Sequence, residues 1–115
     1  MGSEKVDILR ELMSVIQERK HNPSDNSYTS SLLKKGVPKI GEKVTEEAQE
    51  VVDAASEPGE EGRQHTIYEA ADVIYHLFVL LTYSNINLEE VEHELARRFG
   101  ISGLEEKASR SQKES

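Results

Sequence analysis

Residues 69–81 read EAADVIYHLFVLL and form the most apolar run of the chain. A helix that is apolar on nearly every side is a buried helix. This run nevertheless opens with Glu69 and Asp72, two acidic residues three positions apart. Buried carboxylates are costly unless they are paired, protonated or bound to a cation. The run therefore predicts a central helix over residues 65–84, and its two acids need an explanation.

The composition describes an acidic and hydrophilic protein of 115 residues with a net charge of −8 and a hydrophobic share of 36%. This length fits a single domain over residues 1–115. The negative charge argues against nucleic acid or an acidic membrane as a partner, because both require a basic surface. The chain has no cysteine. This excludes disulfides, a thiolate metal site and a cysteine nucleophile.

Targeting signals are missing from the sequence. No run reaches the roughly 18 apolar residues of a membrane span. The first residues also lack the apolar segment of a signal peptide. We therefore expect a cytoplasmic protein.

Apolar residues at steps of three and four predict further helices on both sides of the central one. In order, they cover residues 4–20, a short segment at 27–36, residues 38–56 and residues 88–99. The segment SEPGEEG at 56–62 is typical of a polar loop, and residues 104–115 are expected to form a frayed tail. No strand pattern is present. The sequence predicts an all-α, antiparallel bundle of four main helices.

The acids of the central helix have counterparts on the helix before it. Glu47 and Glu50 share the three-residue spacing that puts both on one helix face. Consecutive helices joined by a short loop pack antiparallel, with axes about 8–10 Å apart, so the two acidic pairs can converge. Such a cluster is an all-oxygen site of the kind that Mg²⁺ prefers. The spacing leaves open that lysines from other helices neutralise Glu69 and Asp72 instead.

Basic residues gather just before these acids. Lys34, Lys35, Lys39 and Lys43 lie within ten residues of an otherwise acidic chain. Lysine together with Mg²⁺ would neutralise a polyphosphate substrate. The alternative is ordinary pairing of Lys43 with Glu47 at i,i+4, worth about 0.2–0.5 kcal/mol. That pairing explains Lys43 but not the cluster.

His76 follows Asp72 by one helical turn. Two roles are open for it. It is either a core histidine that hydrogen bonds to a neighbouring group, or a residue that orients Asp72.

Several motifs resemble one known family. They are SYT at 27–29, KG at 35–36, KIGEKVTEEAQE at 39–50, EAADVIYH at 69–76 and SGLEEK at 102–107. They are similar to phosphoribosyl-ATP pyrophosphohydrolase, the second enzyme of histidine biosynthesis and a member of the all-α, MazG-like nucleoside-triphosphate pyrophosphatases. The carboxylates are common to that superfamily, whereas the other motifs are more specific to the histidine pathway. The short, cysteine-free chain resembles the stand-alone enzyme rather than its fusion to the next enzyme, a cyclohydrolase.

The resemblance implies a homodimer, a requirement for Mg²⁺, and hydrolysis of phosphoribosyl-ATP to phosphoribosyl-AMP and pyrophosphate. The metal ligands that it implies are Glu47, Glu50, Glu69 and Asp72. The catalytic residues that it implies are Glu46 and Glu47, with Glu46 as a further ligand or as the base that positions the attacking water. The substrate contacts that it implies are Tyr28, Thr29, Lys35, Lys39 and Lys43.

Two other functions stay open at this point. An enzyme of the same superfamily that hydrolyses other nucleoside triphosphates would carry the same four carboxylates. A non-enzymatic helical dimer would use the acids structurally. In that dimer, Glu69→Gln and Asp72→Asn would leave stability unchanged or raise it, and Mg²⁺ would not affect melting.

Overall fold

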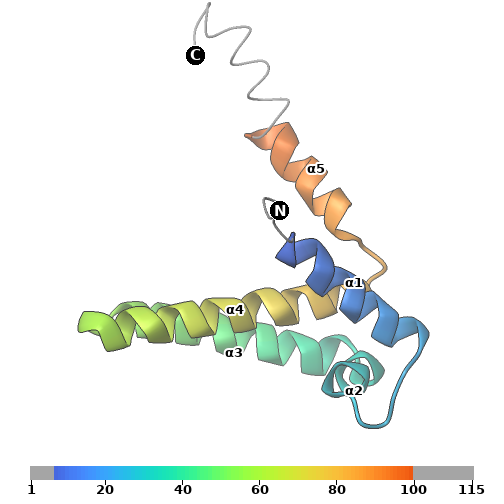
Figure 1. Ribbon diagram of the computed structural model, residues 1–115, viewed down its shortest axis with the longest axis horizontal. Helices are drawn as coiled ribbons and strands as arrows, with labels where there is room; N and C mark the ends of the chain where they lie inside the picture. Colours follow the sequence, from blue (N-terminus) through green and yellow to red (C-terminus); the bar gives the residue numbers. More distant parts are fainter. Residues whose placement is uncertain (1–6, 100–115) are drawn as a thin grey trace, which may run out of the picture. The chain divides into compact units, whose positions relative to one another are not determined.

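The computed structural model describes residues 7–99, in which all regular structure is helical (Figure 1). The helices are α1 Ile8–His21, α2 Tyr28–Lys35, α3 Val37–Ala55, α4 Gly59–Tyr83 and α5 Leu88–Arg98. The all-α prediction is confirmed, with the short α2 as a fifth helix. Within this described part, none of the helices is long and apolar enough to cross a membrane.

The chain divides into two compact units, residues 1–85 and residues 86–115. The first unit holds α1 to α4, and the second holds α5. The expectation of one domain over the whole chain stays a prediction. The expected tail at 104–115 and the SGLEEK motif lie outside the described residues.

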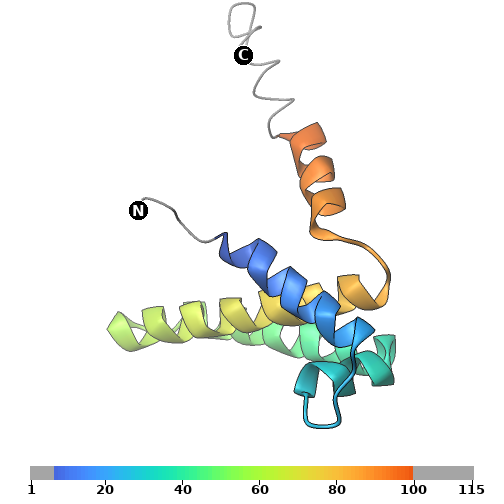
Figure 2. The ribbon, with the colours of Figure 1, turned by 45° about the vertical axis from the view of Figure 1, so that its right-hand side comes forward.

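The centre of the first unit is the pair formed by α3 and α4, which run antiparallel and side by side (Figures 1 and 2). Only residues 56–58 join them. Both α1 and α2 pack against this pair. The most deeply buried apolar side chains come from all four helices, namely Met13, Ile16, Leu32, Ile40 and Val79. The core is therefore built around the same helix pair that carries the candidate acids.

Short-range signals set several helix ends. Ser27 caps α2, since its hydroxyl accepts a hydrogen bond from the Ser30 amide at 3.0 Å. Gly36 separates α2 from α3 and has φ +81°, a conformation that favours glycine. Asn87 and Glu90 form a capping box at the start of α5.

The predicted loop at 56–62 is wrong for most of its length, because α4 begins at Gly59. Pro58 is extended and Gly59 has φ +74°, so the chain turns sharply there. Glu60 and Glu61 then lie in the first turn, where the helix dipole favours acids. A Cβ on Gly62 would lie 2.1 Å from the Glu57 carbonyl oxygen, so only glycine lets the turn close this tightly. The polar composition of residues 56–62 therefore did not reveal that a helix begins there.

In the single chain, α4 is buried on only part of its circumference, although its sequence predicts burial nearly all round. Ile67, Ile74 and Leu77 are 50%, 38% and 39% exposed. At about 100° per residue they share one side of the helix, facing away from Glu69. This apolar stripe, defined by Ile67, Ile74 and Leu77, has no covering element among the described residues.

Candidate active site

The first buried acid of the site is Glu47, which is 8% exposed. It lies on the face of α3 that also buries Ile40 and Ala54. Its Oε1 accepts a hydrogen bond from Nδ1 of His76 on α4, at 2.5 Å. Ala54 and Glu47 are both buried, and His76 supplies the partner that a buried Glu47 needs.

His76 is itself 4% exposed and has partners on both ring nitrogens. Nδ1 also lies 3.1 Å from the Asp72 backbone carbonyl oxygen. Nε2 lies 3.1 Å from the Tyr28 hydroxyl. These contacts place a donated proton on Nδ1, toward Glu47, and a hydrogen bond between Nε2 and the Tyr28 hydroxyl. His76 is thus a hydrogen-bonded core histidine, and the carboxylate that it orients is Glu47 rather than that of Asp72.

Aromatic contacts join the start of α2 to α4. The rings of Tyr28 and Tyr75 stack with their centroids 6.3 Å apart. The Thr29 and Tyr75 hydroxyls hydrogen bond to each other. Burial raises the pKa of Tyr75 above its ordinary value of 10.0. The two residues of the SYT motif predicted to contact substrate, Tyr28 and Thr29, therefore lie next to the His76–Glu47 pair.

The second buried acid is Glu69, which is also 8% exposed. Its Oε2 lies 3.3 Å from Nε2 of His65. Its Oε1 is buried and, among the described residues, has no hydrogen-bond partner. Glu50 of α3 adjoins it, and the pKa of Glu50 is raised because its carboxyl group hydrogen bonds with that of Glu69 and the two charges repel. The structure therefore brings Glu50 and Glu69 together.

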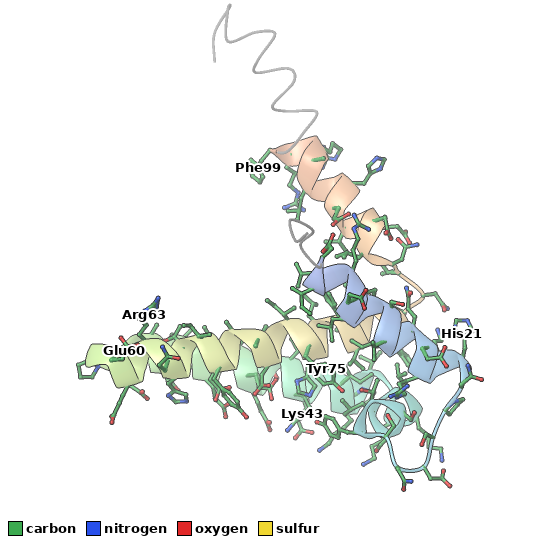
Figure 3. All side chains as sticks on the ribbon, in the orientation of Figure 1. His21, Lys43, Glu60, Arg63, Tyr75 and Phe99 are labelled. Atoms are coloured by element: carbon green, nitrogen blue, oxygen red, sulfur yellow. The ribbon has the colours of Figure 1, made fainter. Side chains whose placement is uncertain are left out.

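The lysines of α3 pair locally. Lys39 Nζ lies 3.2 Å from Glu42 Oε1, and Lys43 Nζ lies 3.8 Å from Glu46 Oε1. The alternative pairing of Lys43 with Glu47 is not what the structure shows, since Glu47 faces His76. Lys35 is exposed in the last turn of α2. Figure 3 shows Lys43 on the part of the helix pair near α2, with Arg63 at the opposite end of α4.

Residues 9–99 match the family model for phosphoribosyl-ATP pyrophosphohydrolase. The chain belongs to this family. A phosphoribosyl-ATP pyrophosphatase of Rhodopirellula baltica is 51% identical, over 91% of this chain and 88% of its own. Another, of Geotalea daltonii, is 53% identical over 90% of this chain and 95% of its own. A third, of Clostridium acetobutylicum, is 46% identical over 83% of this chain and 84% of its own.

The acids of this phosphoribosyl-ATP pyrophosphohydrolase family member carry carboxylate oxygens, the donors that a hard dication such as Mg²⁺ prefers. The buried, unpartnered oxygen of Glu69 beside a second carboxylate is a feature that a cation would satisfy. Within residues 7–99, however, no three acidic or histidine side chains converge closely enough to hold a metal as they stand. Asp72 is half-buried, and its carboxylate makes no hydrogen bond or ion pair in this part of the chain. The donor set fits, but the four acids are not gathered at one point.

His65 contacts the candidate ligand Glu69, a contact that the sequence did not lead us to expect. It bridges two acids, with Nδ1 3.0 Å from Glu57 Oε1 and Nε2 3.3 Å from Glu69 Oε2. Its pKa is raised, chiefly by the hydrogen bond to Glu57. The signal was its spacing of four residues from Glu69, which places both on one helix face. The mistaken loop at 56–62 hid that signal, because it put His65 at a helix end.

Proposed function

We propose that this chain hydrolyses phosphoribosyl-ATP to phosphoribosyl-AMP and pyrophosphate, the second step of histidine biosynthesis. The observation that carries the proposal is family membership over residues 9–99, with relatives about half identical over most of the chain. The acids gathered along α3 and α4 support a hydrolase that acts on a phosphoric anhydride. The expected cytoplasmic location stays a prediction.

The proposed metal ligands are Glu47, Glu50, Glu69 and Asp72. Their support is the unpartnered Oε1 of Glu69 and the adjoining carboxyl group of Glu50. Bound Mg²⁺ would supply charge neutralisation of the phosphates and acidify a water molecule. The remaining work falls to residues that position the substrate, as is usual in phosphoryl transfer.

The positions of the side chains support the other proposed roles. Glu46 is exposed on α3, and among the described residues its one ion pair is with Lys43, so its carboxylate is available to accept a proton from the attacking water. Lys35, Lys39 and Lys43 would neutralise the leaving pyrophosphate. Tyr28 and Thr29 would contact the substrate from α2. Tyr28 also holds His76, which holds Glu47, so substrate contact and ligand orientation share one hydrogen-bonded chain.

We propose further that two copies form a homodimer through the apolar stripe of α4. Ile67, Ile74 and Leu77 are each more than a third exposed in the single chain. Burying a side chain of this size is worth about 1.5–3 kcal/mol. A second copy packed on the stripe would complete an antiparallel bundle around α3 and α4. In light scattering, Ile74→Glu is expected to give a monomer, and a variant that stays dimeric would contradict this surface.

The decisive test of the reaction is a pyrophosphate-release assay with Mg²⁺. It compares phosphoribosyl-ATP with a panel of deoxynucleoside triphosphates at equal concentration. We expect phosphoribosyl-ATP to have the highest kcat/KM. A clear preference for a deoxynucleoside triphosphate would instead make the chain a general nucleotide pyrophosphatase.

A further inference from the structure

A cavity of about 500 Å³ lies away from the candidate metal ligands, none of which lines it. Its walls come from the last turn of α1, the loop at 22–27, and α2, with Tyr83 of α4 closing one side. All of its lining residues belong to the first unit. In Figure 3, His21 marks the end of α1 from which the loop departs.

The cavity is basic, although the protein carries a net charge of −8. Three cationic residues line it, Arg19, Lys20 and Lys34, against one acid, Asp25. Four serine hydroxyls also line it, from Ser24, Ser27, Ser30 and Ser31. A cavity with this lining would bind a compact anion that accepts several hydrogen bonds, as a phosphate monoester does.

The three cations differ in whether they have partners. Lys20 supports the wall, since its Nζ donates to the Thr82 carbonyl at 3.0 Å and to Asn85 Oδ1 at 2.5 Å. In residues 7–99, the side chains of Arg19 and Lys34 make neither an ion pair nor a hydrogen bond. Arg19 is half-buried. A partly desolvated guanidinium without an acidic partner leaves all five of its donors for a ligand.

Tyr83, which closes one side of the cavity, also packs against the junction of α2 and α3. A Cβ on Gly36 would lie 3.1 Å from the Tyr83 hydroxyl oxygen, so glycine there lets the tyrosine ring pack against the α2–α3 junction. From Asp72 to Tyr83, α4 advances by about 16 Å, at ~1.5 Å per residue. A single ligand that reaches both places must be long and negatively charged at both ends. Phosphoribosyl-ATP has this character, with a triphosphate on one side of the adenine and a phosphate monoester on the other.

We propose that this cavity binds the phosphate monoester of the phosphoribosyl group, through Arg19 and Lys34. The inference rests on the proposed function. The cavity then distinguishes phosphoribosyl-ATP from nucleoside triphosphates, which lack that second phosphate. Arg19 contributes a planar fork that matches two phosphate oxygens, and Lys34 contributes a second positive charge.

The kinetic test compares Arg19→Gln, Lys34→Gln and the double variant with the parent. Arg98→Gln is the control, charge-matched to each single variant, because it removes one cation from α5, outside the cavity. We expect the double variant to raise KM for phosphoribosyl-ATP about tenfold to a hundredfold, as charged hydrogen bonds are lost. Its kcat, and its kcat/KM for ATP, should match those of the control. An unchanged KM, or an equal loss with ATP, would overturn the inference.

A binding test without turnover separates this inference from the proposed function. Calorimetry with EDTA present measures ribose 5-phosphate and, separately, inorganic phosphate. We expect ribose 5-phosphate to bind the parent and Arg98→Gln equally, and to bind Arg19→Gln and Lys34→Gln at least tenfold more weakly. Equal binding of both probes, together with an unchanged KM in Arg19→Gln, would mean a site for free phosphate and would overturn the assignment. A parent enzyme that binds ribose 5-phosphate but does not hydrolyse phosphoribosyl-ATP would contradict the proposed function instead.

Discussion

Glu47 and Glu69 are two buried acids on facing helices, each 8% exposed, yet their hydrogen-bond partners differ. Glu47 has a hydrogen bond to His76 at 2.5 Å, and His76 is held in turn by Tyr28. Glu69 has His65 at 3.3 Å on one oxygen and the carboxyl group of Glu50 beside it, and within residues 7–99 its other oxygen has no hydrogen-bond partner. Burial of a carboxylate requires compensation. Among the described residues, His76 compensates for the burial of Glu47, whereas the burial of Glu69 is compensated only in part.

The largest expected effect comes from removing the charge of Glu69, the acid with an unpartnered oxygen. Glu69→Gln should lower kcat/KM for phosphoribosyl-ATP by more than about a hundredfold, the scale seen when one group that stabilises the transition state is lost. Its melting temperature in EDTA should stay the same or rise, because one of two adjoining carboxylates is neutralised. Steady-state kinetics and thermal denaturation measure the two effects. Glu61→Gln, an exposed acid on the same helix, is the control, and parental turnover by Glu69→Gln would remove this residue from the site.

Loss of the hydrogen-bond partner of Glu47 should lower both the stability and the activity of the protein. His76→Phe removes the partner of Glu47 and leaves its carboxylate buried and unpaired, at a cost of about 1–3 kcal/mol in the free energy of unfolding. Activity should fall about tenfold to a hundredfold, as when a residue that orients a metal ligand is lost. Urea denaturation and the pyrophosphate assay test this. Tyr28→Phe, which removes only the hydroxyl at Nε2, should cost less than His76→Phe. If His76→Phe were as stable as the parent, the contrast between the two acids would be wrong.

A subtler effect is expected at Glu50, which adjoins Glu69 and is exposed. Glu50→Gln should slightly raise the melting temperature in EDTA, since the repulsion between the two carboxylates disappears. It should also reduce the increase in melting temperature that Mg²⁺ produces in the parent, because a ligand is lost. Thermal scans with and without Mg²⁺ measure both changes. A lower melting temperature in EDTA would show that Glu50 is a stabilising neighbour of Glu69.

The smallest effect is expected at a partly exposed acid, Glu94 of α5, which extends the comparison to the surface. Hydrogen bonds from Arg97 and Arg98 lower its pKa from 4.5 to about 2. A depressed pKa contributes stability that is fully present above pH 4.5 and is lost as the pH falls through about 2. Solvent screening keeps that contribution small. Titration of Glu94 by NMR should show this pKa in the parent and a value closer to 4.5 in Arg97→Gln, whereas an identical pKa in both would contradict the ion pair.

Local patterns predicted much of the fold, because caps and apolar periodicity act within a few residues. Ser27 and Asn87 cap α2 and α5, close to where the predicted helical segments at 27–36 and 88–99 begin. The wrong prediction of a loop at 56–62 also came from a local pattern, since Pro58 and Gly59 are typical loop residues. Here they form a tight turn that starts α4, and Glu57 can approach residue 62 so closely only because that residue is glycine. The composition of a segment does not show where two parts of its backbone approach each other closely.

For the candidate site, spacing alone selected Glu47, Glu50, Glu69 and Asp72, but it could not say which acids would meet. The sequence by itself determined the all-α class, the acidic pairs and, through its motifs, the family. Only the tertiary structure decided that Glu47 pairs with His76, that Glu50 adjoins Glu69, and that Arg19 and Lys34 line one cavity. The physical reason is that helical periodicity specifies the face of one helix. The partner of a buried charge depends on how two helices are rotated against each other, and packing of the whole core decides that rotation.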